Sequence, residues 1–189
     1  MALVAGVDSS TQSVKVLVCE SSSGEIISSS SAPHPTGTEV NPQSWWHSLT
    51  KALNEKSITD IGGMDQISAI SIAGQQHGLV LLDSSGDIIR PALLWNDVRS
   101  APQAELINRE FPDIAERTGS SLVASFTASK VRWVAENEPE NAAKIAAICL
   151  PHDYISWKLS GSSDISTLFT DRSDASGTGY FNPLTSTYD

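Results

Sequence analysis

The sequence predicts an α/β protein with a mixed central sheet flanked by helices, and three observations lead to this prediction. Two apolar, β-branched runs, Ala2 to Val7 and Val14 to Val18, flank a short polar turn, which is typical of a β-hairpin. A third run, Glu25 to Ser31, follows a serine-rich turn and completes an antiparallel meander. A helical pattern then separates this meander from an alternating strand, Ile67 to Ala73.

The elements of the first half follow from local signals. The first run is apolar throughout, so we expect it to be covered on both faces. Asn41 as N-cap and Pro42 at the first helical position begin a helix that runs to about Asn54, after a polar loop. Helical spacing predicts that Trp45 packs on the sheet and that Trp46 lies near its edge.

The second half shows shorter elements of both kinds, and no linker divides it from the first. Proline, glycine and serine mark the ends of most of them. The expected elements are a hairpin of Gly78 to Leu82 with Asp87 to Arg90, helices at Ser100 to Glu110, Pro112 to Thr118, Thr127 to Asn137 and His152 to Leu159, a helical turn at Pro139 to Lys144, a buried strand at Ile145 to Leu150, and a strand with a turn at Thr178 to Pro183.

Composition limits the classes of function. The chain has 189 residues, of which 40% are hydrophobic, so it can bury a sizeable core as one domain with room for an appended lobe. Its 12 basic and 22 acidic residues give a net charge of −10, which argues against nucleic acid or an anionic membrane as the main partner. No apolar run approaches the roughly 20 residues that span a bilayer, and the start does not resemble a signal peptide. We therefore expect a cytoplasmic protein.

The cysteines and histidines do not indicate a metal centre. Cys19 and Cys149 lie far apart in apolar segments, which favours buried free thiols over a disulfide. The sequence has no CxxC pair, and its four histidines show no ligand spacing.

Three polar clusters follow predicted strands. They are Asp8 to Ser13, Gln75 to His77 and Asn96 to Arg99. We expect the strands before them to share one sheet, and ligands of mixed sheets commonly bind where strands end. The clusters therefore predict a cleft, although the GxxxxGK[ST] and GxGxxG nucleotide fingerprints are absent.

The first cluster contains groups that suit phosphate and magnesium. Hydroxyl, amide and turn N–H groups after Asp8 can donate to phosphate oxygens, and the Asp8 carboxylate could hold a hydrated magnesium ion. On its own, this stretch favours the simpler interpretation of a polar hairpin turn without a ligand.

Seven motifs in order resemble the FGGY carbohydrate kinases, and within that family the bacterial xylulokinases most. The likeness runs from Leu3 onward, and the ordered set is far more specific than any single motif. The motifs are Asp8 to Lys15, Gly74 to Gly78, Trp95 to Arg99, Phe126 to Lys130, Asn137 to Pro139, Leu150 to Tyr154 and Ser173 to Thr178.

The resemblance implies an actin-like, ribonuclease-H-like fold of two lobes, with ATP and Mg²⁺ in the cleft between them. Residues 1–189 resemble the N-terminal, sugar-binding lobe of such a kinase. The family's catalytic aspartate and its adenine-binding lobe belong to later segments. We therefore expect a truncated chain that has little kinase activity alone, and whose open sheet edge leaves room for a homodimer.

The resemblance also assigns residues to the phosphate site. Asp8 matches the family's first-strand aspartate, which is important for activity and lies near the phosphates and the metal, an indirect magnesium contact. The family usually has glycines where Ser10 and Ser13 stand, so the backbone of this turn departs from the pattern. The residues expected to face ATP are Ser10, Thr11, Gln12 and Lys15.

A second set is implied to bind the sugar. Gln76 and His77 match the pair that contacts the ketose in xylulokinases, and both side chains can hydrogen-bond a hydroxyl. Trp95 could offer an apolar face to the sugar, with Asp97 and Arg99 shaping the pocket. The alternative for the last three is a core tryptophan and a surface ion pair.

The implied reaction is transfer of the ATP γ-phosphate to D-xylulose, which gives D-xylulose 5-phosphate. The Gln76 and His77 pair favours a ketose, because glycerol kinases typically carry Arg-Glu at these positions. Two alternatives stay open: another FGGY sugar or polyol kinase, and a non-catalytic sugar-binding module.

Overall fold

The computed structural model describes residues 2–189, and the chain divides into two compact units. The first contains the residues up to Thr36 together with Pro42–Gln75. The second contains Gly37–Asn41 together with Gln76–Asp189. The sequence did not indicate this division, because no composition change marks it.

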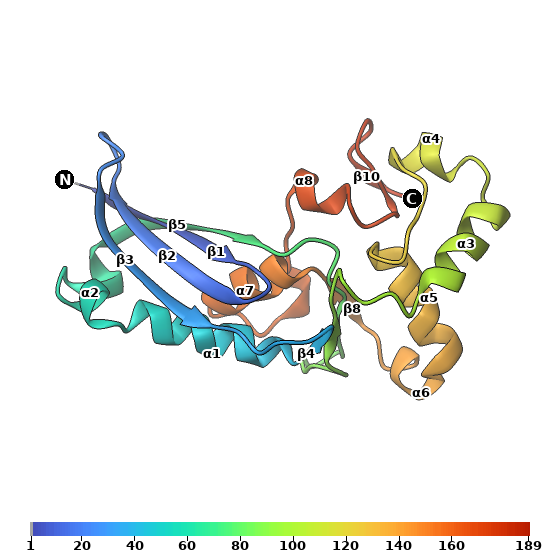
Figure 1. Ribbon diagram of the computed structural model, residues 1–189, viewed down its shortest axis with the longest axis horizontal. Helices are drawn as coiled ribbons and strands as arrows, with labels where there is room; N and C mark the ends of the chain where they lie inside the picture. Colours follow the sequence, from blue (N-terminus) through green and yellow to red (C-terminus); the bar gives the residue numbers. More distant parts are fainter. Residues whose placement is uncertain (1) are drawn as a thin grey trace. The chain divides into compact units, whose positions relative to one another are not determined.

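The first unit is built on a four-stranded mixed sheet in the order β3-β2-β1-β5 (Figure 1). The first three strands pair antiparallel, which confirms the predicted meander, and β5 pairs parallel with β1. The elements of this unit are β1 Leu3–Ser9, β2 Ser13–Glu20, β3 Ile26–Pro33, α1 Pro42–Leu53, α2 Lys56–Thr59, a 3₁₀ helix Gly63–Gln66 and β5 Ile67–Gly74.

Strand β1 is buried at alternate residues. Ala5 and Val7 are buried, whereas Gly6 and Asp8 are exposed. The expectation that both faces of this strand are covered was wrong, because Gly6 adds no side chain to the second face and Asp8 ends that face with a charge. The uncovered face is the one that carries Asp8.

The covered face packs against α1, which contacts β2 and β3 (Figure 1). Trp45, Leu49 and Ala52 of this helix are fully buried, as the helical spacing predicts. The serines of β3 bind the helical layer as well: the Ser28 hydroxyl donates to the Ser57 carbonyl at 2.6 Å, and the Ser30 hydroxyl donates to the Ala52 carbonyl at 2.8 Å. These bonds satisfy carbonyls near helix ends.

The second unit contains short strands in antiparallel pairs and most of the helices. The pairs are β4 with β7, β6 with β8, and β9 with β10. The elements are β4 Glu39–Val40, β6 Val80–Leu82, β7 Ala92–Leu93, α3 Ala101–Glu110, α4 Ile114–Thr118, α5 Thr127–Asn137, α6 Pro139–Ala142, β8 Ala147–Cys149, α7 Pro151–Leu159, a 3₁₀ helix Ile165–Thr167, α8 Arg172–Ala175, β9 Phe181–Asn182 and β10 Thr187–Tyr188.

The strand pairing corrects one prediction about the three polar clusters. The first two follow β1 and β5, which do share a sheet. The third follows β7, which pairs with β4 in a separate two-stranded sheet. Strand β4 has only two residues, so no periodicity could reveal it.

Most other elements agree with the prediction. The hairpin around residues 78–90 is confirmed by a bridge between Leu82 and Ile88. Gly119, at φ 85°, ends α4 as expected. Ser100 precedes α3, but its hydroxyl donates to the Ala124 carbonyl at 3.0 Å and does not cap the helix. Both described cysteines are free, although Cys19 is only half-buried.

No helix in residues 2–189 combines the length and the apolar character that crossing a bilayer requires.

Leu49→Ala tests the packing of α1 on the sheet. The leucine is fully buried, so we expect the substitution to lower the free energy of unfolding by about 2–5 kcal/mol through the cavity it leaves. The control is Leu17→Ala on the uncovered face of β2, where the side chain is 42% exposed and the loss should be about 1 kcal/mol or less. Urea unfolding followed by circular dichroism measures both, and equal losses would contradict this packing.

Candidate functional site

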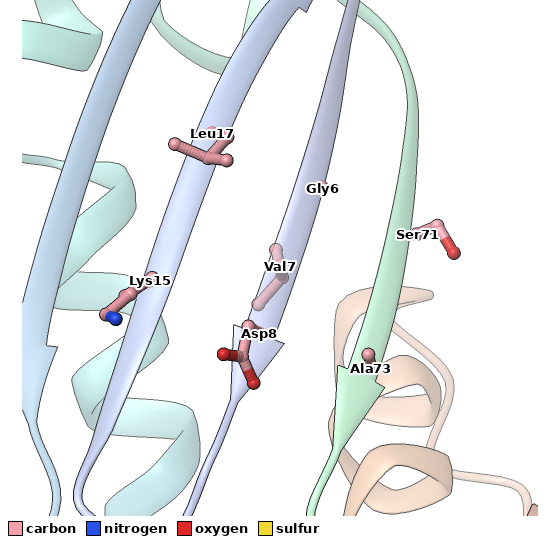
Figure 2. A pocket seen from close by; sticks show the side chains of 7 residues that line it. All are labelled: Gly6, Val7, Asp8, Lys15, Leu17, Ser71 and Ala73. Carbon is pink, nitrogen blue, oxygen red and sulfur yellow. The ribbon is translucent and has the colours of Figure 1, made fainter.

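The first unit places Asp8 at one edge of the mixed sheet. Because β1 and β5 run parallel, their carboxyl ends reach the same edge, where the Gln75 N–H donates to the Ser9 carbonyl at 3.1 Å. Asp8 lies between Lys15 on β2 and Ala73 on β5 (Figure 2). These three side chains help to line a hollow of about 410 Å³ on the uncovered face.

Some hydrogen-bond donors of the turn after Asp8 bind acceptors within the same segment. The Ser10 hydroxyl donates to Asp8 Oδ1 at 2.6 Å, and the Ser10 N–H donates to the Ser13 carbonyl at 3.0 Å. In this structure the hydroxyl and the N–H of Ser10 are therefore bound within the chain. Thr11 is half-buried, and Gln12 and Lys15 are exposed.

A residue that the sequence analysis missed, His34, fixes this turn. Its Nδ1 lies 2.9 Å from the Ser10 carbonyl oxygen, and its backbone N–H donates to the Gln12 carbonyl at 2.8 Å. Since a carbonyl only accepts, Nδ1 carries a proton. Burial lowers the pKa of His34, so the ring is neutral near pH 7. Only the pairing of β2 with β3 brings His34 to the turn, and no spacing in the sequence could show this.

Gln75 was also missed as a candidate within its cluster. It is buried, whereas the neighbouring Gln76 is exposed. Neither amide atom of the Gln75 side chain has a hydrogen-bond partner among the described residues. Buried polar groups are usually satisfied, so a water or a ligand would stabilise this amide.

In the second unit, His77 is held in one orientation and one tautomer. Its backbone has φ 62°, which is uncommon for a residue other than glycine. Its Nδ1 lies 2.7 Å from the carbonyl oxygen of Gly177, a residue 100 positions away. Because that oxygen only accepts, Nδ1 carries the proton. Burial lowers the pKa of His77, so near pH 7 the ring is neutral and Nε2 presents a lone pair.

The N-terminal end of α5 forms a wall beside His77. The Phe126 ring lies 4.9 Å from the imidazole, centroid to centroid, and the Thr127 hydroxyl donates to the His77 carbonyl at 3.3 Å. Three motifs that lie far apart in the sequence, at residues 74–78, 126–130 and 173–178, therefore meet at this histidine.

Lys130, one turn further along α5, is fully buried. Its Nζ donates to the carbonyl oxygens of Ala124, at 3.1 Å, and Ser125. Burial lowers the pKa of Lys130 to about 7. Its charge in turn opposes a charge on His77, which supports a neutral imidazole there.

In the segment from Trp95 to Arg99, the tryptophan is exposed, whereas Asp97 is buried and bound by Arg99. Trp95 is 47% exposed, so the alternative of a core tryptophan was wrong. Asp97 is 5% exposed, and its Oδ1 and Oδ2 accept from Arg99 Nε and Nη2, both at 2.9 Å. Burial raises the pKa of Asp97, but the Arg99 hydrogen bonds outweigh burial and hold the pKa below its usual range. This pair is partly buried, and its carboxylate is already bound.

Arg99 connects this pair to a wider network. Its Nη2 also lies 2.8 Å from Glu39 on β4, whose other carboxylate oxygen lies 2.6 Å from Arg90. Arg90 in turn pairs with Glu138 at 2.9 Å, and the Arg99 guanidinium lies over the Trp133 ring at 5.0 Å. Asp97 and Arg99 therefore hold the loop after Trp95 in place.

Gly177→Ala tests the contact that orients His77. A Cβ at this position would lie 2.5 Å from His77 Cε1 and 2.6 Å from Nδ1, so the ring must move and its bond to the 177 carbonyl must weaken. We expect a loss of about 1–3 kcal/mol in the free energy of unfolding and a changed ¹⁵N shift of His77 Nδ1.

The matched control for that variant is Gly6→Ala, where a Cβ meets nothing within 4 Å. It should leave the His77 signals unchanged. An unaltered His77 Nδ1 signal in the Gly177→Ala chain would contradict the contact.

The chain is similar to known proteins along almost its whole length. The model of the FGGY family of carbohydrate kinases, N-terminal domain, matches residues 3–189. Xylulose kinases from Streptomyces coelicolor and Streptomyces rubiginosus are each 46% identical over 194 residues, which cover 99% of this chain and 38% of those proteins. The crystal structure of a xylulose kinase from Bifidobacterium adolescentis superposes with a TM-score of 0.91 at 45% identity, over 99% of this chain and 41% of that one.

These matches cover the described fold from end to end, and they confirm the α/β architecture with its mixed sheet. The chain spans 38% of the length of the two Streptomyces proteins. Because the family model matches almost every residue, the chain belongs to the FGGY family of carbohydrate kinases, as an N-terminal domain of that family.

Proposed function

We propose that this chain is the sugar-binding, N-terminal part of an ATP-dependent kinase that phosphorylates D-xylulose to D-xylulose 5-phosphate. The observation that carries the proposal is the fixed tautomer of His77, which leaves Nε2 as a hydrogen-bond acceptor beside the exposed Gln76. The similarity to xylulose kinases from two Streptomyces species supports the choice of sugar.

The chemistry of these side chains suits a polyhydroxylated ligand. A neutral imidazole accepts a hydroxyl proton at Nε2, and the Gln76 amide both donates and accepts. The half-exposed indole of Trp95 offers an apolar face to sugar C–H groups. Asp97 contributes as a support for the loop, because its oxygens are already bound by Arg99.

The Asp8 edge suits the phosphates of ATP. Thr11 and Gln12 offer a hydroxyl and an amide, and Lys15 adds a positive charge to the hollow that Asp8 lines. Ser10 would act through Asp8, to which its hydroxyl is bonded.

One exposed carboxylate fits a Mg²⁺ ion that keeps most of its waters and bridges to phosphate. When bound, such an ion would neutralise charge on the transferred phosphate. Asp8 would hold it through water, and its bond from Ser10 would keep the carboxylate in place.

We assign the general base of the reaction to no residue of this chain. Phosphoryl transfer needs donor, metal and acceptor to be aligned, so we predict little turnover by the isolated chain. The free cysteines support a reducing compartment, and we place the protein in the cytoplasm.

Calorimetric titration with D-xylulose tests the proposal, with glycerol, D-ribulose and L-fuculose as comparators. We expect selective binding of D-xylulose, and His77→Ala should weaken it by about tenfold or more because the acceptor at Nε2 is lost. His47→Ala, at an exposed position of α1, is the control and should bind normally. Equal binding of glycerol and D-xylulose, or unchanged binding by His77→Ala, would contradict the proposal.

A further inference from the structure

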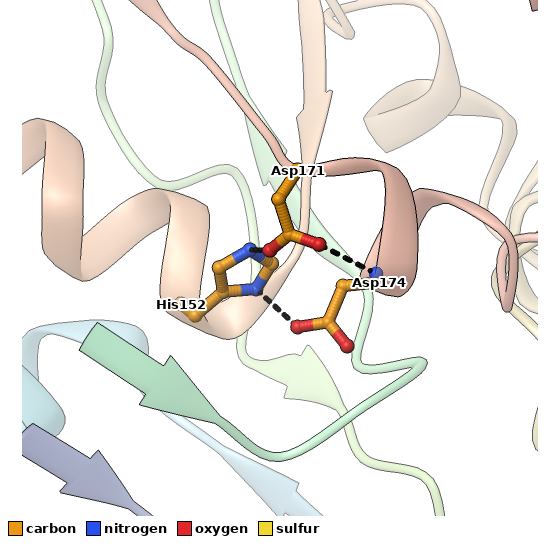
Figure 3. A group of neighbouring side chains, drawn as sticks. All are labelled: His152, Asp171 and Asp174. Atoms are coloured by element: carbon orange, nitrogen blue, oxygen red, sulfur yellow. Dashed lines mark hydrogen bonds and ion pairs between the residues drawn. The ribbon is translucent and has the colours of Figure 1, made fainter. Parts of the chain in front are cut away.

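His152, at the start of α7, is surrounded by three carboxylates (Figure 3). Its side chain is 7% exposed. Its Nδ1 lies 2.9 Å from Asp174 Oδ2. Its Nε2 lies 2.9 Å from Asp153 Oδ1 and 3.1 Å from Asp171 Oδ2. Both ring nitrogens therefore face carboxylate oxygens.

This geometry favours a proton on each ring nitrogen. A neutral imidazole has one N–H, so its other nitrogen would set a lone pair against the lone pairs of an ionised carboxylate. The imidazolium removes that repulsion and attracts the carboxylates on both sides, although His152 Nδ1 and Asp153 Oδ1 form no hydrogen bond with any described residue in this geometry. Burial lowers the pKa of His152, but the three carboxylates outweigh burial and raise its pKa above the usual value.

The three aspartates around His152 also interact with its positive charge. Asp174 is 14% exposed, and burial raises its pKa above the usual value, although the charge of His152 opposes that rise. Without a positive charge on His152, the carboxylates of Asp153, Asp171 and Asp174 would repel one another at close range.

A shared metal ion is a poorer explanation of this cluster. Histidine coordinates a metal through one nitrogen. One ligand atom each from His152, Asp171 and Asp174 lies within 4.8 Å of the others, but the two aspartates contact opposite nitrogens of the ring (Figure 3), so only one of them can share a metal with the nitrogen it now faces.

A series of hydrogen bonds connects Asp171 and Asp174 with Gly177, the residue that orients His77. Asp171 caps α8 by accepting the Asp174 N–H at 2.9 Å. The carbonyl of Asp174 accepts the Gly177 N–H at 3.1 Å, which closes the turn. The carbonyl of Gly177 then accepts from His77 Nδ1 at 2.7 Å.

We propose that His152 is a positioning residue, whose imidazolium holds the turn from Asp171 to Gly177 and thereby orients His77. The effect on His77 stands on its own, whereas any effect on sugar affinity rests on the proposed function above.

The proposal gives a pH dependence of known sign. The groups that face His152 are Asp153 on its own helix and Asp171 and Asp174 on the α8 turn, and His77 lies beyond Asp174. A histidine whose pKa is raised by folding stabilises the fold fully below its unfolded pKa of 6.5. That contribution is lost as pH rises through the higher, folded pKa. The turn should therefore loosen as the pH rises above 6.5 and through the folded pKa of His152.

Histidine-selective ¹⁵N NMR of the chain, with amide exchange, tests this proposal. In the wild type, we expect both nitrogens of His152 to be protonated below pH 6.5 and the ring to lose a proton above pH 6.5. His152→Gln should displace the Nδ1–H signal of His77 and speed amide exchange at residues 175–178 by roughly tenfold or more, the effect of removing one partner of a buried ion pair.

Two further variants separate charge from shape. His152→Lys keeps a cation and should restore much of the wild-type exchange, whereas His47→Gln, on α1, should change neither readout. If His152→Gln does not fold, the wild-type titration decides, because the His77 signal must follow the titration of His152.

Three results would overturn the proposal. These are a His152 pKa at or below 6.5, a His77 signal that ignores both the variant and the pH, and a Mg²⁺ or Zn²⁺ titration that binds at His152 and displaces its protons. Neither readout uses a sugar, so failure of D-xylulose binding with these results intact would refute the proposed function alone.

Discussion

The hydrogen bond from His77 Nδ1 to the Gly177 carbonyl is the contact on which the second unit's site depends. It joins the loop after β5 to the turn after α8. On α5 and just before it, Thr127 and Phe126 also contact His77. A backbone carbonyl cannot donate, so the bond also decides which nitrogen is left for a ligand. A single contact between distant segments thus sets both the position and the chemistry of the histidine.

In the first unit, different contacts hold the turn after Asp8 in place. Parallel pairing of β1 with β5 brings two strand ends to one edge, and His34 then ties down the turn that follows Asp8. In both units a neutral histidine, His34 buried and His77 half-buried, donates from Nδ1 to a carbonyl and fixes a loop. Gln12 and Gln76, in those two loops, are exposed.

Local patterns in the sequence were enough to predict the meander and the long helices, because strand alternation and capping residues act over a few positions. They did not reveal β4, whose two residues pair with a strand some fifty positions later, or the separate sheet of β7. Asp8 and His77 could be identified from their motifs, but His34, Gln75 and His152 could not be assigned roles. Their roles come from tertiary contacts with Ser10, with the end of β5, and with the α8 turn.

We propose that His77 offers Nε2 as an acceptor to a sugar hydroxyl. A long-range ¹H–¹⁵N spectrum of the chain at pH 7, recorded without and with saturating D-xylulose, tests it most directly. We expect a proton on Nδ1 in both spectra, with an Nε2 resonance that moves when the sugar binds. A proton on Nε2, or an Nε2 resonance that stays in place while the sugar is bound, would contradict it.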